Sequence, residues 1–352
     1  MIFYVVTGTH SYTVGLYFKL YRDSLAVQPQ ILFYEQLATL RSFQPGTYIF
    51  GDVERLTPGH AETAAQIWQK LADAGPAVRL LNHPTRSMRR YELLRTLYER
   101  GINTFNVYNV AEQRLPTRFP VFIRREDDHE GNISELIHSP AALNTALADL
   151  NTQGLMREDK LIVELCDTAD ADGIIRKYGT FIMGDQILPG HLYFSKHWMI
   201  KATSDLNPLP PELQAEVHTY LDTNPHEQEL REICRIANIQ YGRVDYGIKD
   251  GKLQIWEINT NPSMPMNKLA HVGGYTLAVQ KRVNYYNNAL AMIDTPADST
   301  AAIANPYYER QTRRLSVKVL ELIPRRYRPY IKHQIRAWQR NDLPLLRRKK
   351  KE

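Results

Sequence analysis

Short apolar runs alternate with stretches of helical periodicity through the first part of the chain. Four runs rich in β-branched and aromatic residues predict strands: Ile2–Thr7, Ile31–Tyr34, Thr47–Asp52 and Val78–Leu81. Helices are predicted between them over Tyr12–Leu20 and over Ala61–Ala74, which stops before Gly75-Pro76. Strands that alternate with helices predict a small parallel sheet with helices on its faces.

Asn82-His83-Pro84 marks the end of this unit. Beyond it, the hydrophobic pattern predicts helices over Arg89–Arg100, Glu227–Ala237 and Leu277–Met292, and strands over Phe119–Arg124, Lys160–Asp167 and Gly173–Gly184. Linkers are predicted over Pro208–Pro211 and Thr295–Asn305. The predicted fold class is α+β, with a small α/β domain over residues 1–84, a larger domain over 85–294, and a linker with a basic, partly amphipathic helical tail over 295–352.

A β-hairpin is predicted around Asp250-Gly251, a dipeptide typical of two-residue type I′ turns because glycine tolerates positive φ. Its strands are Gly242–Lys249 and Lys252–Asn259. Side chains alternate between the two faces of a strand. Folding about the turn therefore brings Asp245 opposite Glu257, to within one residue of register.

The hairpin gathers two carboxylates and the amide of Asn259, with the guanidinium of Arg243 nearby. Like charges so close are unfavourable unless a cation lies between them, and hard oxygen ligands suit Mg²⁺. The alternative interpretation is a surface hairpin with scattered charges.

These strands resemble the metal-binding signature of the ATP-grasp superfamily, an Arg-x-Asp strand followed by a Glu-x-Asn-x-x-Pro strand. The matching residues are Arg243-Val244-Asp245 and Glu257-Ile258-Asn259-Thr260-Asn261-Pro262. The resemblance implies an ATP-grasp fold preceded by a pre-ATP-grasp domain. It implies further that Asp245, Glu257 and Asn259 hold Mg²⁺ on the phosphates of ATP, while Arg243 acts catalytically on the transferring phosphoryl group.

Other stretches resemble phosphate-binding parts of the family. Phe119–Arg124 is similar to a strand that ends in a phosphate-binding Lys, for which this chain has Arg124. Asp127–Ser134 stands where the family has a glycine-rich flap, with Gly131 as its one glycine; a polar turn is the alternative. Lys201, at the end of an apolar strand, is predicted to contact phosphate and to act catalytically with Arg243, and Lys177 is predicted to replace the charge of an Arg that relatives carry at the position of Gly179.

Lys160–Asp167 resembles the strand on which the family binds adenine. The resemblance places Glu164 at the first acidic position and gives the backbone of Leu165 and Cys166 to the base. Asp167, Asp170 and Asp172 are alternative ribose ligands.

The resemblance implies a ligase that uses ATP and Mg²⁺ to activate a small-molecule or peptide carboxylate as an acyl phosphate, which an amine or thiol then attacks. Two alternatives stay open: a kinase that phosphorylates a hydroxyl, and a non-catalytic nucleotide-binding module. The acceptor is not encoded in any motif of the chain.

Composition is that of an ordinary globular protein, with 43% hydrophobic and 23% charged residues. Cys166 and Cys234 show no metal-ligand spacing, which favours a reducing, cytoplasmic setting. The apolar start of the chain is too short for a secretory signal, and no run is long enough to span a bilayer. Gly8-Thr9-His10-Ser11 matches no phosphate-loop motif, so no nucleotide site is predicted there.

Charge is distributed unevenly along the chain. Residues 307–352 hold 15 Lys and Arg against 4 Asp and Glu, a net charge of +11, whereas the rest of the chain carries −5. A basic segment that also contains Leu, Ile, Trp and Tyr suits an anionic membrane surface, so peripheral attachment at the inner membrane surface is one expectation. The alternative is a helix packed on the body. Nucleic acid is not an expected partner, because the body is acidic and the tail carries no reading motif.

Overall fold

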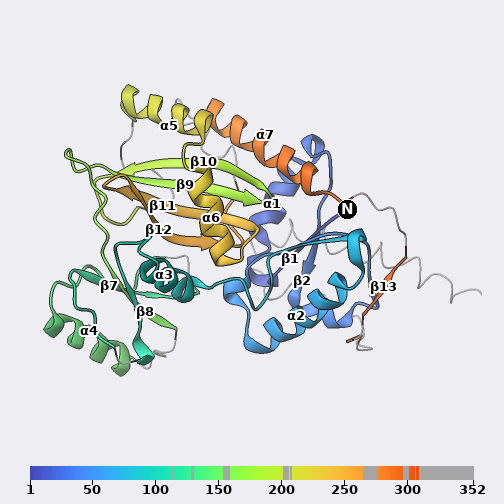
Figure 1. Ribbon diagram of the computed structural model, residues 1–352, viewed down its shortest axis with the longest axis horizontal. Helices are drawn as coiled ribbons and strands as arrows, with labels where there is room; N and C mark the ends of the chain where they lie inside the picture. The colour runs from blue at the N-terminus through green and yellow to red at the C-terminus, as the bar shows by residue number, and fades with distance from the viewer. Residues whose placement is uncertain are drawn as a thin grey trace, which may run out of the picture.

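A parallel four-stranded sheet forms the N-terminal part of the computed structural model (Figure 1). Its strands are β1 (Ile2–Val6), β2 (Gln30–Phe33), β4 (Gly46–Phe50) and β5 (Val78–Leu81), in the order β2-β1-β4-β5. Alternate residues of β1 enter two cores. Ile2, Tyr4 and Val6 pack with helices α1 (Tyr12–Leu20) and α7 (Thr276–Ile293), and Phe3 and Val5 pack with α2 (Pro58–Ala72). The predicted parallel sheet with helices on its faces is confirmed.

The structure describes residues 1–112, 114–127, 131–153, 159–200, 206, 208–264, 276–295, 301–305 and 307–308. Two predictions lie outside these residues, the phosphate contact of Lys201 and the basic tail beyond residue 308, and the predicted flap over Asp127–Ser134 lies partly outside them. Within the described part of the chain, no helix has both the length and the apolar character that crossing a bilayer requires.

A second, antiparallel sheet carries the predicted hairpin. Its strands are β9 (Ile175–Met183), β10 (Gln186–Ser195), β11 (Tyr241–Lys249) and β12 (Lys252–Asn259), in the order β10-β9-β11-β12. One face is apolar and packs with α5 (Pro211–Thr223) and α6 (Glu227–Ala237), for example through Tyr246 of β11 and Tyr220 of α5. The hairpin carboxylates therefore lie on the face that these two helices leave uncovered.

A third sheet has the order β6-β8-β7 and is also antiparallel. It consists of β6 (Val107–Asn109), β7 (Val121–Arg125) and β8 (Lys160–Glu164), with α4 (Pro140–Thr152) in its core cluster. Helix α3 (Arg90–Glu99) joins it to the second sheet, because Leu93 and Leu97 enter the core of the second sheet and Leu94 enters that of the third. The expected α+β class is confirmed.

Several elements differ from the sequence predictions. Pro189-Gly190 disrupts the apolar pattern of β10, and a bulge accommodates it between Pro189 and His191. Pro211 begins α5 and does not end a linker, since proline suits the first turn of a helix. The predicted linker over Thr295–Asn305 contains β13 (Ile303–Ala304), which pairs with β3 (Ser42–Phe43). Short 3₁₀ turns lie at Gly8–His10, Arg22–Ser24, Tyr34–Thr39, Val53–Arg55, Gly75–Ala77 and Val110–Glu112.

Asn82 joins the parallel sheet to the hairpin sheet at the predicted domain boundary. Its Nδ2 donates to the carbonyl oxygens of Phe50 and Tyr241 at 3.0 and 2.9 Å, and its Oδ1 accepts from the N–H groups of Gln240 and Tyr241 at 2.8 and 2.9 Å. The residue is buried and has a φ of 61°, a conformation that Asn tolerates. One continuous core also includes Tyr4 and Tyr241, so packing runs across residue 84.

Asn82→Ala is expected to lower the free energy of unfolding by about 3 kcal/mol, because it leaves buried backbone groups without partners and because alanine tolerates positive φ less well than asparagine. Asn82→Gly is the matched control, since it loses the same hydrogen bonds but tolerates the φ value. Urea unfolding should place Asn82→Gly about 1 kcal/mol above Asn82→Ala. Wild-type stability of both variants would contradict the joining role.

Candidate functional site

The predicted hairpin forms with the expected turn. Asp250 and Gly251 both have positive φ, 49° and 73°, as a type I′ turn requires. The register places Asp245 opposite Glu257 and Arg243 opposite Asn259. A bulge at Trp256 of β12 shifts the pairing, so that Ile255 packs with Tyr246 on the helix-covered side of the sheet while Glu257 lies opposite Asp245. The one-residue uncertainty of the sequence prediction is thereby resolved in favour of direct pairing.

Asp245 is buried and holds two cations. Arg243 donates from Nε to Oδ1 at 2.6 Å and from Nη2 to Oδ2 at 3.0 Å, and Lys177 Nζ lies 2.9 Å from Oδ2. Burial on its own raises the pKa of this carboxyl, but the charges of Arg243 and Lys177 outweigh burial and lower the pKa to about 2. Asp245 is therefore an anion that orients two cationic side chains on one face of the sheet.

Glu257, the partner of Asp245 across the hairpin, is held by two arginines from outside the sheet. Arg90, at the start of α3, contacts its Oε2, and Arg124 Nη2 from β7 lies 3.3 Å from the same oxygen. Arg90 also donates to the carbonyl oxygens of Arg125 and Glu126 at 3.1 and 2.6 Å. Glu257 thus ties the hairpin to α3 and to the third sheet.

Among the described residues, the site carries more positive than negative charge. Four cationic side chains, Arg90, Arg124, Lys177 and Arg243, surround the two carboxylates, and these six groups have a net charge of +2. All four are largely buried, with exposed side-chain fractions from 4% to 17%. Excess charge in a poorly solvated site is unfavourable until an anion binds, so the arrangement suits a polyanion.

Asn259 adds a buried oxygen to this site. Its Nδ2 donates to Glu257 Oε1 at 3.1 Å, whereas no described residue gives its buried Oδ1 a hydrogen-bond partner. An unpaired carbonyl oxygen beside a carboxylate fits a Mg²⁺ ion. Asp245 fits less well, because Arg243 and Lys177 already occupy both of its oxygens. No group of three His, Cys, Asp or Glu gathers at one point among the described residues.

Glu164, expected at the adenine strand, is buried with its carboxylate fully engaged. It accepts from Asn106 N–H and Tyr108 Oη, each at 3.0 Å, and pairs with Arg118 at 3.1 Å. The N–H of Leu165 donates to Pro120 O at 2.9 Å. The Glu164 side chain is thus part of the packing of the third sheet.

The remaining predicted nucleotide ligands lie near this strand or at the flap. Cys166 Sγ contacts Gln254 Oε1 at 3.6 Å, and burial raises the pKa of its thiol. Asp167 is exposed, and its carboxylate accepts from the N–H of Ala169 at 3.0 Å. Gly131 has a φ of 127°, which favours glycine. The structure brings together Arg124, Lys177, Arg243, Asp245, Glu257 and Asn259, but it does not bring the Glu164 carboxylate into this group.

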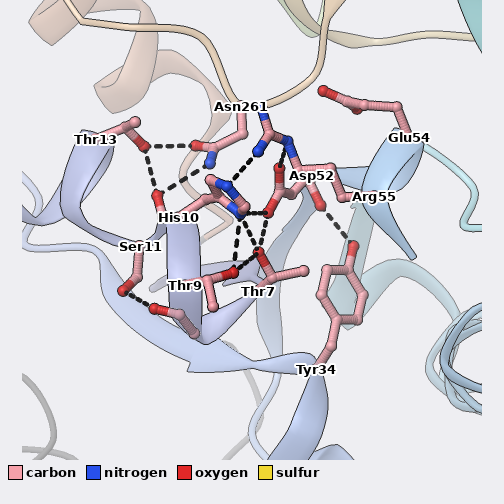
Figure 2. A network of polar contacts seen from close by, with 12 residues as sticks. Thr7, Thr9, His10, Ser11, Thr13, Tyr34, Asp52, Glu54, Arg55 and Asn261 are labelled. Atoms are coloured by element: carbon pink, nitrogen blue, oxygen red, sulfur yellow. Dashed lines mark hydrogen bonds and ion pairs between the residues drawn. The ribbon is translucent and has the colours of Figure 1, made fainter. Parts of the chain in front are cut away.

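A second polar network lies at the carboxyl ends of β1 and β4 (Figure 2). His10 Nδ1 lies 3.1 Å from Thr7 Oγ1 and 3.5 Å from Asp52 Oδ2, and its Nε2 contacts Arg55. Arg55 Nε lies 3.2 Å from Asp52 Oδ1. Asp52 is buried and left-handed, with a φ of 59°. Sequence reasoning missed this cluster, although Asp52 and Gly8-Thr9-His10 both follow predicted strands, where ligands commonly bind in parallel sheets.

The chain beyond β12 connects the two networks. Asn261 Oδ1 accepts from Thr13 Oγ1 at 2.8 Å, and its Nδ2 donates to His10 O at 3.2 Å (Figure 2). Thr260 Oγ1 donates to Glu54 at 2.5 Å and accepts from the N–H of Val53 at 3.0 Å. The Glu-x-Asn-x-x-Pro segment therefore runs from the charged face of the hairpin to the edge of the parallel sheet.

Comparison with protein-family models and with curated proteins gave no match. Solved structures similar to this chain include a D-alanine–D-alanine ligase from Bacillus anthracis complexed with ATP, at 14% identity and a TM-score of 0.45, over 83% of this chain and 97% of that one. A RimK domain ATP-grasp protein from Sphaerobacter thermophilus matches at 11% identity and a TM-score of 0.43, over 83% and 100% of the two chains. An L-amino acid ligase from Bacillus licheniformis matches at 11% and 0.38, over 82% and 73%.

All three TM-scores lie below 0.5, so neither the folds nor the activities in these names carry over to this chain.

Asp245→Asn is expected to lower the free energy of unfolding by about 3 kcal/mol, because it leaves Arg243 and Lys177 buried without their anion. Glu232→Gln is the matched control: it removes an exposed carboxylate, paired with Arg235 at 2.6 Å, and should change stability by less than about 1 kcal/mol. Guanidinium unfolding of both variants measures the contrast. Equal small effects would show that Asp245 does not hold the cationic face together.

Proposed function

We propose that this chain is an ATP- and Mg²⁺-dependent ligase that activates a substrate carboxylate as an acyl phosphate for attack by an amine or a thiol. The observation that carries the proposal is the cluster of four buried cations around Asp245 and Glu257, which together have a net charge of +2 in the part of the chain that the structure describes. The ATP-grasp resemblance of the hairpin supports the reaction class.

The cations suit the phosphates of ATP. Arg124, Lys177 and Arg243 would contact the β- and γ-phosphates from two sheets, with Arg243 and Lys177 held ready by Asp245. Such preorganised charges stabilise a transferring phosphoryl group, since they need no reorganisation during the reaction. Lys201 remains a further candidate for this group of contacts.

Glu257 and Asn259 would hold Mg²⁺, which supplies charge neutralisation and orientation of the phosphate oxygens. The unpaired, buried Oδ1 of Asn259 supports this assignment. Asp245 would serve chiefly to position Arg243 and Lys177. For it to bind the metal directly, one of its cation pairs would have to open.

Adenine would lie against the backbone that follows Glu164, with Leu165 and Cys166 as its contacts. Asp167 is then a candidate for the ribose, and Gly131 for the flap over the phosphates. The Glu164 carboxylate would act indirectly, since Asn106, Tyr108 and Arg118 hold it inside the third sheet.

The substrate carboxylate and the amine would bind between the charged face and the edge of the parallel sheet. The contacts of Asn261 with Thr13 and His10 support this placement, because they join the two polar networks. In the reaction the γ-phosphoryl moves from ATP to a carboxylate oxygen and ADP leaves. The amine nitrogen then attacks the acyl carbon and loses a proton, and inorganic phosphate departs.

Glu257→Gln is expected to weaken binding of ATP at least tenfold in the presence of Mg²⁺, because the metal loses a charged ligand. Isothermal titration calorimetry with and without Mg²⁺ measures this, and Glu232→Gln serves as the control that should bind like wild type. Undiminished Mg²⁺-dependent binding in Glu257→Gln would remove Glu257 from the metal site.

Phosphate release that requires both an acid and an amine separates the ligase from a kinase, which would form a stable phosphorylated product.

The tail supports a proposal of its own, peripheral attachment to an anionic membrane. Each basic residue near such a surface contributes about 1 kcal/mol, so a fraction of the net charge of +11 is sufficient. The full chain should sediment with phosphatidylserine vesicles at low salt and dissociate at high salt. A chain that ends at Tyr308 should stay in the supernatant. If both behave alike, the tail has no role at membranes.

A further inference from the structure

His191 lies in the row of residues that crosses the charged face of the second sheet. The registers pair Glu257 with Asp245, Asp245 with Gly179, and Gly179 with His191. Neighbouring strands are about 4.8 Å apart, and Gly179 has no side chain to separate its two neighbours. The structure places His191 within β10.

The imidazole of His191 occupies the space above Gly179. A β-carbon added to Gly179 would lie 2.2 Å from His191 Cε1 and 2.4 Å from its Nε2, so the ring covers the middle strand directly. The Tyr193 ring stacks on it, with centroids 4.2 Å apart and an interplanar angle of 13°. Tyr193 is itself opposite Lys177 in the register. The ring therefore has a fixed position beside Asp245 and its two cations.

The Nε2 atom of His191 is buried, and no described residue gives it a hydrogen-bond partner. The residue as a whole is 7% exposed. Burial, followed by the charge of Arg243, lowers the pKa of His191 well below its usual range, so the ring is neutral at pH 7. An unpaired buried polar atom is unfavourable. Such an atom, on the face of the sheet that carries Arg243 and Lys177, indicates a partner that arrives with the ligand.

We propose that His191 donates a hydrogen bond from Nε2–H to the terminal phosphoryl group of the bound nucleotide, beside Arg243 and Lys177. A neutral donor adds a directional contact without a further positive charge next to two cations. The proposal rests on the proposed function, because it takes ATP as the ligand. It assigns His191 to substrate binding. It also explains why residue 179 is a glycine, since a side chain there would occupy the space of the imidazole ring.

The test compares binding of ATP and ADP, each with Mg²⁺, by isothermal titration calorimetry. His191→Phe keeps a ring that can stack on Tyr193 but removes the donor. This variant should lower the affinity for ATP about tenfold and change the affinity for ADP less than twofold, because ADP lacks the terminal phosphoryl group. His191→Gln, whose amide N–H₂ can reach the position of Nε2, should recover most of the loss. Gly179→Ala should act like His191→Phe, since its methyl group displaces the imidazole.

His226→Phe is the matched control on the opposite face of the same sheet, where His226 Nδ1 lies 2.9 Å from Tyr246 Oη. It should leave the ratio of the two affinities unchanged. If His191→Phe and Gly179→Ala leave that ratio at its wild-type value, or weaken both nucleotides equally, His191 is a packing residue and the inference is overturned. If wild type binds neither nucleotide, the proposed function itself is overturned.

Discussion

Two carboxylates that face each other across a hairpin set the constraint on which the site depends. Asp245 and Glu257 are direct register partners, and like charges in that position repel. Cations from four elements compensate this repulsion: Arg243 in β11, Lys177 in β9, Arg90 at the start of α3 and Arg124 in β7. Because two of the cations come from outside the hairpin sheet, the charges of the carboxylates are compensated only when α3 and the third sheet pack against the hairpin.

The same hairpin also contacts the parallel sheet at two places, near the start of β11 and beyond the end of β12. Asn82 binds the backbone of Phe50 on one side and of Tyr241 on the other, near the start of β11. Beyond the end of β12, Thr260 and Asn261 bind residues at the carboxyl edge of the parallel sheet. The charged face is thus held from both ends of the hairpin. A site with buried charges needs such rigidity, since small displacements would leave ions without partners.

Sequence reasoning succeeded where the information is local. The Asp250-Gly251 turn sets a register that brings Asp245 to within one residue of Glu257, and the bulge in β12 supplies the remaining one-residue shift. Alternating hydrophobic patterns likewise predicted the parallel sheet and helix α6. The contacts of Arg90 and His191 depend on tertiary placement, which no local pattern encodes. Glu164 shows the same limit: its strand was predicted, but two donors to its carboxylate, Asn106 and Tyr108, lie 58 and 56 positions away, and Arg118 lies in the loop before β7.

The central claim is that the cationic face of the hairpin sheet binds the phosphates of ATP. A crystal structure of the full chain with Mg²⁺ and a non-hydrolysable ATP analogue tests it most directly. The account predicts phosphate oxygens within hydrogen-bond distance of Lys177 and Arg243, and a metal ion on Glu257 and Asn259. An analogue bound elsewhere, with the pairs of Asp245 and Glu257 unchanged and no ligand on this face, would contradict it.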